Sequence, residues 1–212
     1  MREKFEEELT AIKNNMTKMG DMCKSSISIA IEYMLDDGEE RLNKVKEIEA
    51  GINKMESTIV SQCMVVFMRE QPVAGDLRMV SSALRIISDM ERIGDHALDV
   101  TEVARNLDRK RLPDMSVLKT MADSSLLMVT DVVKAFVDGD VELANAVIKY
   151  DDVVDGDFFR IKKKISEEIS ENIETADQGL DLLMISKYLE RISDHAVNIA
   201  EWVKFSVTGE RY

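Results

Sequence analysis

The sequence contains few of the residues that interrupt regular structure. Among its 212 residues there are only two prolines and nine glycines, and these two residue types are the strongest breakers of helices and strands. Long, uninterrupted elements are therefore expected. Hydrophobic residues make up 45% of the chain and charged residues 33%, a balance that is typical of amphipathic helices and argues against disorder.

Cysteines and long apolar runs are also scarce. Cys23 and Cys63 are the only cysteines. Because they lack CxxC spacing and have no neighbouring histidine, they are predicted to be reduced, packed thiols of an intracellular protein. No stretch approaches the roughly 20 apolar residues that a membrane span needs, and the first residues show no apolar signal-peptide segment. We therefore expect no direct insertion into a membrane.

Positive charge is in short supply. The chain has 28 Lys and Arg against 41 Asp and Glu, which gives a formal net charge of −13. Such a field works against nucleic acid, whose phosphates need Lys and Arg, and against an anionic membrane surface. It favours metal cations or partners with basic patches. We therefore expect no nucleic-acid partner.

The apolar residues recur in steps of three and four, a spacing that predicts helices packed almost parallel to their neighbours. Such seams run through both halves of the chain. The first is predicted to end at a glycine cap at Gly38, and Pro72 is predicted to lie in the first turn of another helix. A polar break is expected at 174–177, before the last helix. The first seam contains Phe5, Leu9, Ile12, Met16, Met19 and Cys23.

The two halves of the sequence repeat one plan. Adding 99 takes Glu91 to Glu190 and His96 to His195, and adding 102 takes Glu49 to Asp151. The charged segment 108–114 near mid-chain is interpreted as a solvated junction. We therefore predict an all-α fold of two tandem, related antiparallel three-helix bundles with six long helices, spanning residues 1–110 and 111–212.

Each half ends in the same acidic motif. The first reads Glu91-Arg92-Ile93-Gly94-Asp95-His96-Ala97 and the second Glu190-Arg191-Ile192-Ser193-Asp194-His195-Ala196. On a helix, carboxylates four residues apart share a face, with Cβ atoms roughly 5–6 Å from each other. Two like charges at this spacing repel, so they call for a cation, a basic partner or solvent.

The second helix of each half is predicted to bring further oxygen ligands to this motif. Asp151 takes a seam position expected to be apolar, with Asp155 beside it, and Glu49 and Asn53 are the equivalents in the first half. A buried carboxylate without a partner is unfavourable by several kcal/mol or takes up a proton. Clustered carboxylates without thiolates suit Mg, Ca, Mn or Fe.

A second interpretation of the acidic motifs needs no metal. Arg92, Arg191 or cations from other helices could neutralise these carboxylates on a solvated face. The histidines lie about 140° around the helix from the glutamates. His96 and His195 are therefore expected to support packing or to bond to a neighbouring helix.

Known helical metal sites and enzyme motifs do not match. Di-iron bundles of the ferritin type use Glu-x-x-His, which this sequence lacks, and a hemerythrin-like site needs more than the two histidines present. P-loop, GxGxxG, GxSxG and HExxH motifs are also missing, and no nucleophile has a base beside it. The sequence is therefore not expected to be an enzyme.

Together with the segment Arg69-Glu70-Gln71-Pro72-Val73-Ala74-Gly75-Asp76-Leu77-Arg78, the paired motifs give a family resemblance. Over essentially its whole length the chain resembles the PhoU family, the accessory and regulatory proteins of the phosphate-specific transport system. The resemblance implies a cytoplasmic protein of two related three-helix bundles, often dimeric, and associated peripherally with the inner membrane face through partners. It further implies restraint of phosphate uptake when phosphate is plentiful, and a link between the transporter's ATPase subunit and the phosphate-sensing histidine kinase.

The resemblance also implies multinuclear metal clusters, with iron first and Mg, Mn or Ca as alternatives. Carried over residue by residue, the metal positions are Glu49, Glu91, Asp95, Asp151, Asp155, Glu190 and Asp194. The chain departs from the family pattern at Asn53, where Asp is expected, so the first site is predicted to be the weaker one. A protein devoted to metal binding or storage is the alternative function, and a plain helical scaffold is the third.

Overall fold

The computed structural model describes residues 2–36, 38–70, 72–109 and 116–210. Over these residues the chain forms six long α-helices and one short 3-10 turn, which confirms the predicted all-helical fold. The elements are α1 (Arg2–Leu35), α2 (Glu39–Glu70), α3 (Ala74–Ala104), α4 (Ser116–Asp138), α5 (Val141–Glu171), η1 (Ile173–Thr175) and α6 (Ala176–Thr208).

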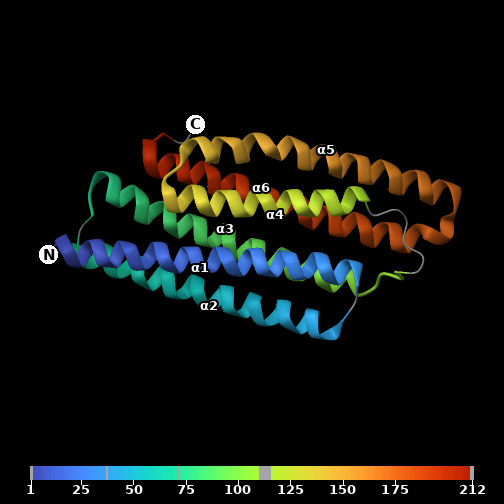
Figure 1. Cartoon of the computed structure of the whole chain (residues 1–212), viewed down its shortest axis with the longest axis horizontal. Coiled ribbons are helices and arrows are strands. Elements are labelled where there is room, and N and C mark those ends of the chain that lie inside the picture. Colours follow the sequence, from blue (N-terminus) through green and yellow to red (C-terminus); the bar gives the residue numbers. More distant parts are fainter. Residues whose placement is uncertain (1, 37, 71, 110–115, 211–212) are drawn as a thin grey trace.

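The helices lie along one long axis, and consecutive helices run in opposite directions (Figure 1). Helices α1–α3 form one bundle and α4–α6 form the other, beside it. The most extensive helix contact of the molecule joins α3 to α6, and α1 also packs against α4. This arrangement confirms the two related bundles. Within the described residues, no helix is long and apolar enough to cross a membrane.

Two glycines and one capping side chain explain several helix ends. Gly139 ends α4 with φ 66°, and Gly209 ends α6 with φ 80°, a backbone conformation that glycine adopts without a steric penalty. The side chain of Asp140 then accepts a hydrogen bond from the Leu143 N–H at 2.9 Å and caps α5. Such an N-cap contributes about 1 kcal/mol.

Two predicted helix ends are wrong in detail. Gly38 does not cap α1: its carbonyl accepts from the N–H groups of Arg41 at 2.8 Å and Leu42 at 3.4 Å, so it begins α2 instead. Pro72 lies before α3 rather than in its first turn, because Val73 is extended, with φ −124° and ψ 157°. The predicted junction 108–114 lies outside the described residues from Lys110 onward.

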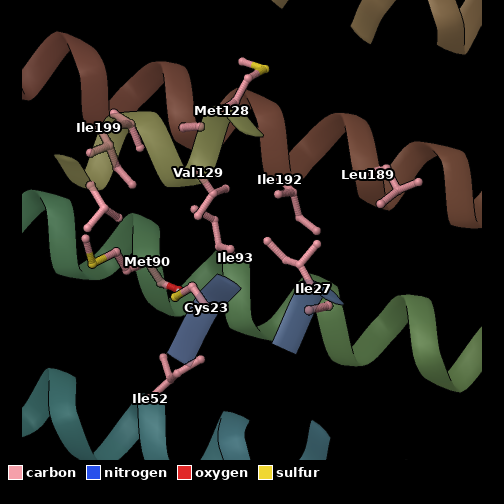
Figure 2. Close-up of a cluster of buried hydrophobic side chains, with 14 of the residues drawn as sticks. Cys23, Ile27, Ile52, Met90, Ile93, Met128, Val129, Leu189, Ile192 and Ile199 are labelled. Carbon is pink, nitrogen blue, oxygen red and sulfur yellow. The ribbon is translucent and has the colours of Figure 1, made fainter. Parts of the chain in front are cut away.

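The two bundles share one apolar core. Buried side chains of all six α-helices form a single cluster that runs through both bundles, and Figure 2 shows the part of it in which side chains of α1, α3, α4 and α6 meet. Cys23 is fully buried in this cluster, and its Sγ donates a hydrogen bond to the Met90 carbonyl of α3 at 3.3 Å. Both cysteines are buried free thiols. The shared core therefore holds the relative position of the two bundles.

The contact between α1 and α4 depends on a glycine. A Cβ built on Gly20 would lie 2.7 Å from both methyl groups of Val133, which is closer than real Cβ contacts. Val133 is itself buried, so it has little space into which it can move. Gly20 therefore allows the close approach of the two bundles at this point.

We expect Gly20→Ala to lower the free energy of unfolding by about 1–3 kcal/mol, because the added methyl overpacks a closed interface. Gly156→Ala is the matched control, since a Cβ built there meets no atom within 4 Å. That variant should be stabilised by up to about 1 kcal/mol through helix propensity. Urea unfolding of both variants measures the difference, and equal effects would contradict this account of Gly20.

Candidate functional site

The register between α2 and α3 brings the first acidic motif opposite the second helix. Lys46 of α2 forms an ion pair with Glu102 of α3 at 3.6 Å. A Cβ built on Gly94 would lie 2.8 Å from Cδ1 of Ile52, so the helices approach closely within the motif itself. Because the helices are antiparallel, the residues that follow Ile52 on α2 face those that precede Gly94 on α3.

The structure brings the first-half carboxylates into one electrostatic group. Burial raises the pKa of Glu91, and the negative charges of Asp95, Glu56 and Glu49 raise it further, whereas Arg92 lowers it. Glu91 and Asp95 are partly buried, with side-chain exposures of 22% and 31%. The predicted residues Glu49, Glu91 and Asp95 therefore act on one another, together with a fourth carboxylate, Glu56.

The side chains of Arg92 and Asn53 offset part of the negative charge of these carboxylates. The Arg92 guanidinium lies 3.4 Å from Glu91 and 3.2 Å from Asp95. Asn53 donates a hydrogen bond through Nδ2 to Oε1 of Glu49 at 2.5 Å, while its Oδ1 is buried without a partner. A buried carbonyl oxygen without a donor is unfavourable, so this oxygen is open to a cation or a hydrogen-bond donor.

The second half holds the equivalent group between α5 and α6. Burial, followed by the charges of Asp155, Asp194 and Glu190, raises the pKa of Asp151 to about 6. Burial and Glu190 likewise raise the pKa of Asp194. Oδ1 of Asp151 is buried and has no hydrogen-bond partner. The four carboxylates predicted for this half therefore act as one group.

A lysine lies beside the carboxylates at one end of the second acidic group. Lys187 forms an ion pair with Glu190, and its ammonium lies over the Phe158 ring at 5.4 Å. The positions equivalent to Lys187 and Phe158 in the first half are Ser88 and Glu56. The two groups therefore have different neighbours at this end, a cation on an aromatic ring in one and a hydroxyl and a carboxylate in the other.

The histidines lie between the two acidic groups, at the contact of α3 with α6. Nδ1 of His195 bonds to Oδ1 of Asp89 across the bundles at 2.8 Å. The His96 ring stacks on the His195 ring at 5.6 Å and contacts Tyr188 at the same centroid distance. Burial lowers the pKa of His96, which the hydrogen bond with Asp99 partly offsets. The prediction that the histidines serve packing and inter-helix bonding is confirmed.

The residue types fit a hard cation. Each group offers carboxylates that repel one another and one buried oxygen without a donor, Asn53 Oδ1 or Asp151 Oδ1. Oxygen ligands of this kind suit Mg, Ca, Mn and Fe ions. In the described parts of the chain, however, no three or more His, Cys, Asp and Glu side chains stand close enough together to hold a metal ion. Metal ligation by these residues therefore stays a prediction.

Sequence reasoning missed three residues of this region. Glu56 had a usable signal, because it lies seven residues after Glu49 and so on the same helix face. Lys187 and Asp89 had none, since their partners come from spatial neighbours that the pattern of one helix does not reveal. Asp89 in particular bonds to His195, which lies 106 residues further along the chain.

Comparison with known proteins identifies the family of this chain. The profile of the PhoU domain matches residues 16–104 and 118–203, one match in each bundle. The chain belongs to the PhoU family. It is therefore a PhoU-family accessory protein of phosphate transport with two tandem domains, and this family is regulatory rather than enzymatic.

Individual PhoU proteins match over almost their whole length. The Phosphate-specific transport system accessory protein PhoU homolog 1 of Thermotoga maritima is 33% identical, over 97% of this chain and 90% of that protein. The crystal structure of PhoU from Pseudomonas aeruginosa superposes with a TM-score of 0.92 at 31% identity, covering 97% of this chain and 100% of that one. The phosphate transport system regulatory protein PhoU from Streptococcus pneumoniae gives a TM-score of 0.91 at 26% identity, covering 98% of this chain and 99% of that one.

The raised pKa of Asp151 predicts a pH dependence of stability in the metal-free protein. The carboxyl ordinarily titrates near 3.8 and here near 6, so its ionisation opposes folding. The stability of the native protein should therefore fall relative to Asp151→Asn as the pH rises from 4 to 7. Because the side chain is only partly buried, we expect a difference of about 1–2 kcal/mol, below the full value of the shift.

Urea unfolding at pH 4 and pH 7 measures this difference. Glu167→Gln on the same helix is the control, since its side chain is 63% exposed. The Asp151→Asn variant should gain stability relative to the native protein only at the higher pH. An equal gain at both pH values would contradict a carboxyl that titrates near 6.

Proposed function

We propose that this chain is a non-enzymatic negative regulator of phosphate uptake and of phosphate-responsive signalling. It acts by contact with the ATPase subunit of the phosphate ABC transporter and with the phosphate-sensing histidine kinase. The observation that carries the proposal is the full-length similarity to PhoU proteins in both sequence and fold. These relatives are accessory and regulatory proteins of phosphate transport, and both bundles take part in the match.

We also propose a cellular compartment and an oligomeric state for this protein. The protein is cytoplasmic, reaches the inner face of the membrane only through its partners, and forms a homodimer. The net charge of −13 supports protein partners with basic patches over a direct attraction to anionic lipid. The reduced state assigned to the buried thiols of Cys23 and Cys63 suits the same compartment.

Metal binding by the two acidic groups is part of the proposal. Glu49, Glu91 and Asp95 would hold a cation in the first bundle. In the second, the ligands would be Asp151, Asp155, Glu190 and Asp194. A bound cation supplies positive charge where carboxylates otherwise repel, and so would clamp α2 to α3 and α5 to α6. Arg92 and Lys187 provide part of that charge in the metal-free protein.

A second candidate function rests on these same groups. The buried, partnerless oxygens of Asn53 and Asp151 favour a protein whose main role is to bind or store iron or another hard cation. The two candidates differ in their cellular effect. A storage protein would alter cellular metal content, whereas a regulator would alter the response to phosphate.

The regulatory proposal predicts a defined phenotype. In cells that carry this chain, its deletion should leave phosphate-starvation genes expressed in phosphate-rich medium, because the restraining contact is lost. A reporter fused to such a gene measures the effect, and the intact chain supplied in trans should restore repression. Pull-down with the transporter ATPase subunit and with the sensor kinase tests the contacts. Normal repression after deletion, with neither protein captured, would refute the regulatory proposal.

The metal proposal predicts a loss confined to one bundle. Purified Glu190→Gln/Asp194→Asn should lose at least about half of the iron of the native protein, because two of the four carboxylates of the second, stronger site are neutralised. Elemental analysis by plasma mass spectrometry measures the iron content. The control is Glu171→Gln/Asp177→Asn, which removes two exposed carboxylates far from either motif. An unchanged iron content in the Glu190 variant would exclude second-bundle ligation.

A further inference from the structure

The outward side of α2 carries no charge over its last three turns. The twelve residues 57–68 include no Asp, Glu, Lys or Arg. Among the described residues α2 packs only against α1 and α3, and it lies along the edge of the molecule farthest from α5 (Figure 1). This side therefore lacks the charged residues that usually cover the solvated face of a helix. Its exposed residues are Ser57, Thr58, Ser61, Met64 and Met68.

The second bundle has the same helix side in its ordinary, solvated form. Lys163 of α5, the equivalent of Ser61, is 79% exposed and pairs with Glu167. Because α2 and α5 occupy equivalent places, the fold itself does not require an uncharged side on α2. The difference favours a partner that covers α2 and leaves α5 in solvent. The charged residues among the equivalent positions 159–170 are Arg160, Lys162, Lys163, Lys164, Glu167 and Glu168.

A groove of about 500 Å³ lies beside this side of α2, between α2 and α1. Short side chains leave the space open, and the two helices are joined beside it by a hydrogen bond from Nδ2 of Asn15 to Oε1 of Gln62 at 3.0 Å. Helices pack by placing their side chains into such grooves, so the space suits a further helix. The groove is lined by Glu8, Ala11, Thr58, Ser61, Gln62 and Val65.

The hydroxyl groups of the groove act as hydrogen-bond acceptors. Those of Thr58 and Ser61 donate within their own helix, to the carbonyls of Lys54 and Ser57, each at 2.9 Å. Each hydroxyl has one hydrogen, so its oxygen can only accept a bond from an occupant of the groove. The groove is therefore suited to an occupant that brings donors.

Glu8 adds a negative charge that lacks a counterpart at one oxygen. Its Oε2 is buried and has no hydrogen-bond partner within the described part of the chain, which is unfavourable for a carboxylate. The side chain as a whole is only half-buried, so rotation about its bonds brings this oxygen to an occupant of the groove. A carboxylate beside acceptor hydroxyls is complementary to the donors of Lys or Arg.

We propose that the groove between α1 and α2 is a docking site for an amphipathic helix of a partner protein that carries Lys or Arg. The basic side chain enters the groove and pairs with Glu8. Apolar side chains of the same helix contact Met64 and Met68, which are 47% and 74% exposed and belong to the residue type best able to adapt to a partner. A second copy of this chain is disfavoured, because it carries the same net charge of −13.

This inference rests on the proposed regulatory function, so the probes are membrane vesicles that contain either the intact phosphate transporter or the intact sensor kinase. Ser61→Arg places a long cation in the groove, where it fills the space and pairs with Glu8. Binding of the purified chain to the vesicles should therefore weaken at least about 10-fold. Ser166→Arg is the matched control, because it adds the same side chain at an exposed position of α5.

Glu8→Gln tests the charge itself. The variant keeps the size of the side chain, and vesicle binding should again weaken at least about 10-fold. The urea midpoint of the free chain should not fall, because the oxygen that is lost had no partner. Glu7→Gln, at an exposed neighbouring position, is the control. Unchanged binding of Glu8→Gln, or weaker binding together with a lower urea midpoint, would overturn the pairing role of Glu8.

Photo-crosslinking identifies the occupant. Benzoylphenylalanine in place of Met64 in the full chain should cross-link to a helix of the transporter ATPase subunit or of the kinase that contains Lys or Arg. The same group in place of Ser166, the equivalent position of α5, should give no such product. A cross-link from position 64 to a second copy of the chain, or to a segment without Lys and Arg, would overturn the inference.

Failure of the docking site differs from failure of the regulatory function. If the native chain binds either kind of vesicle and Ser61→Arg binds equally well, the docking site is overturned while the regulatory proposal stands. The same holds if Ser166→Arg loses as much affinity as Ser61→Arg, since the effect is then one of overall charge. If the native chain binds neither kind of vesicle, the regulatory proposal fails and the docking site fails with it.

Discussion

The packing of α3 against α6 is the constraint on which the rest of the molecule depends. These two helices carry both acidic motifs, share the most extensive contact, and contribute side chains to the core common to both bundles. Each then accepts its own second helix on the outer side. The spacing between the two acidic groups is therefore determined mainly by the apolar packing of α3 on α6, with the hydrogen bond between His195 and Asp89 as a polar contact across the same interface.

The acidic groups are held together against their own repulsion. The raised pKa values of Glu91, Asp151 and Asp194 record that ionisation is disfavoured at these positions. The surrounding helices bury enough apolar surface to tolerate this cost, and Gly94 lets α2 approach α3 closely at the first motif. Such unfavourable clusters typically mark functional sites, because stability alone would not select them.

Sequence periodicity predicted a large part of this structure. Apolar seams identified the helices and their duplication, and the four-residue spacing correctly placed Glu91 beside Asp95 and Glu190 beside Asp194. It could not predict the residues whose role depends on contacts between helices. Glu56, Lys187 and Asp89 take part through the inter-helix register, which close approaches such as that of Ile52 to Gly94 determine. The predictions for the helix ends at Gly38 and Pro72 were wrong, because the backbone conformation of a single residue determined where each helix begins.

The common core has a consequence for how the two halves have diverged. Because α3 and α6 are equivalent helices that pack on each other, the chain resembles a symmetric dimer whose subunits have been joined end to end. In a true dimer every substitution occurs twice and must suit both sides of the axis. Once the subunits are joined, one side can change alone, as in the exchanges of Glu56 for Phe158, Ser88 for Lys187 and Asp89 for Tyr188. A duplicated framework of this kind can keep its symmetry in the core while its two faces acquire different ligands.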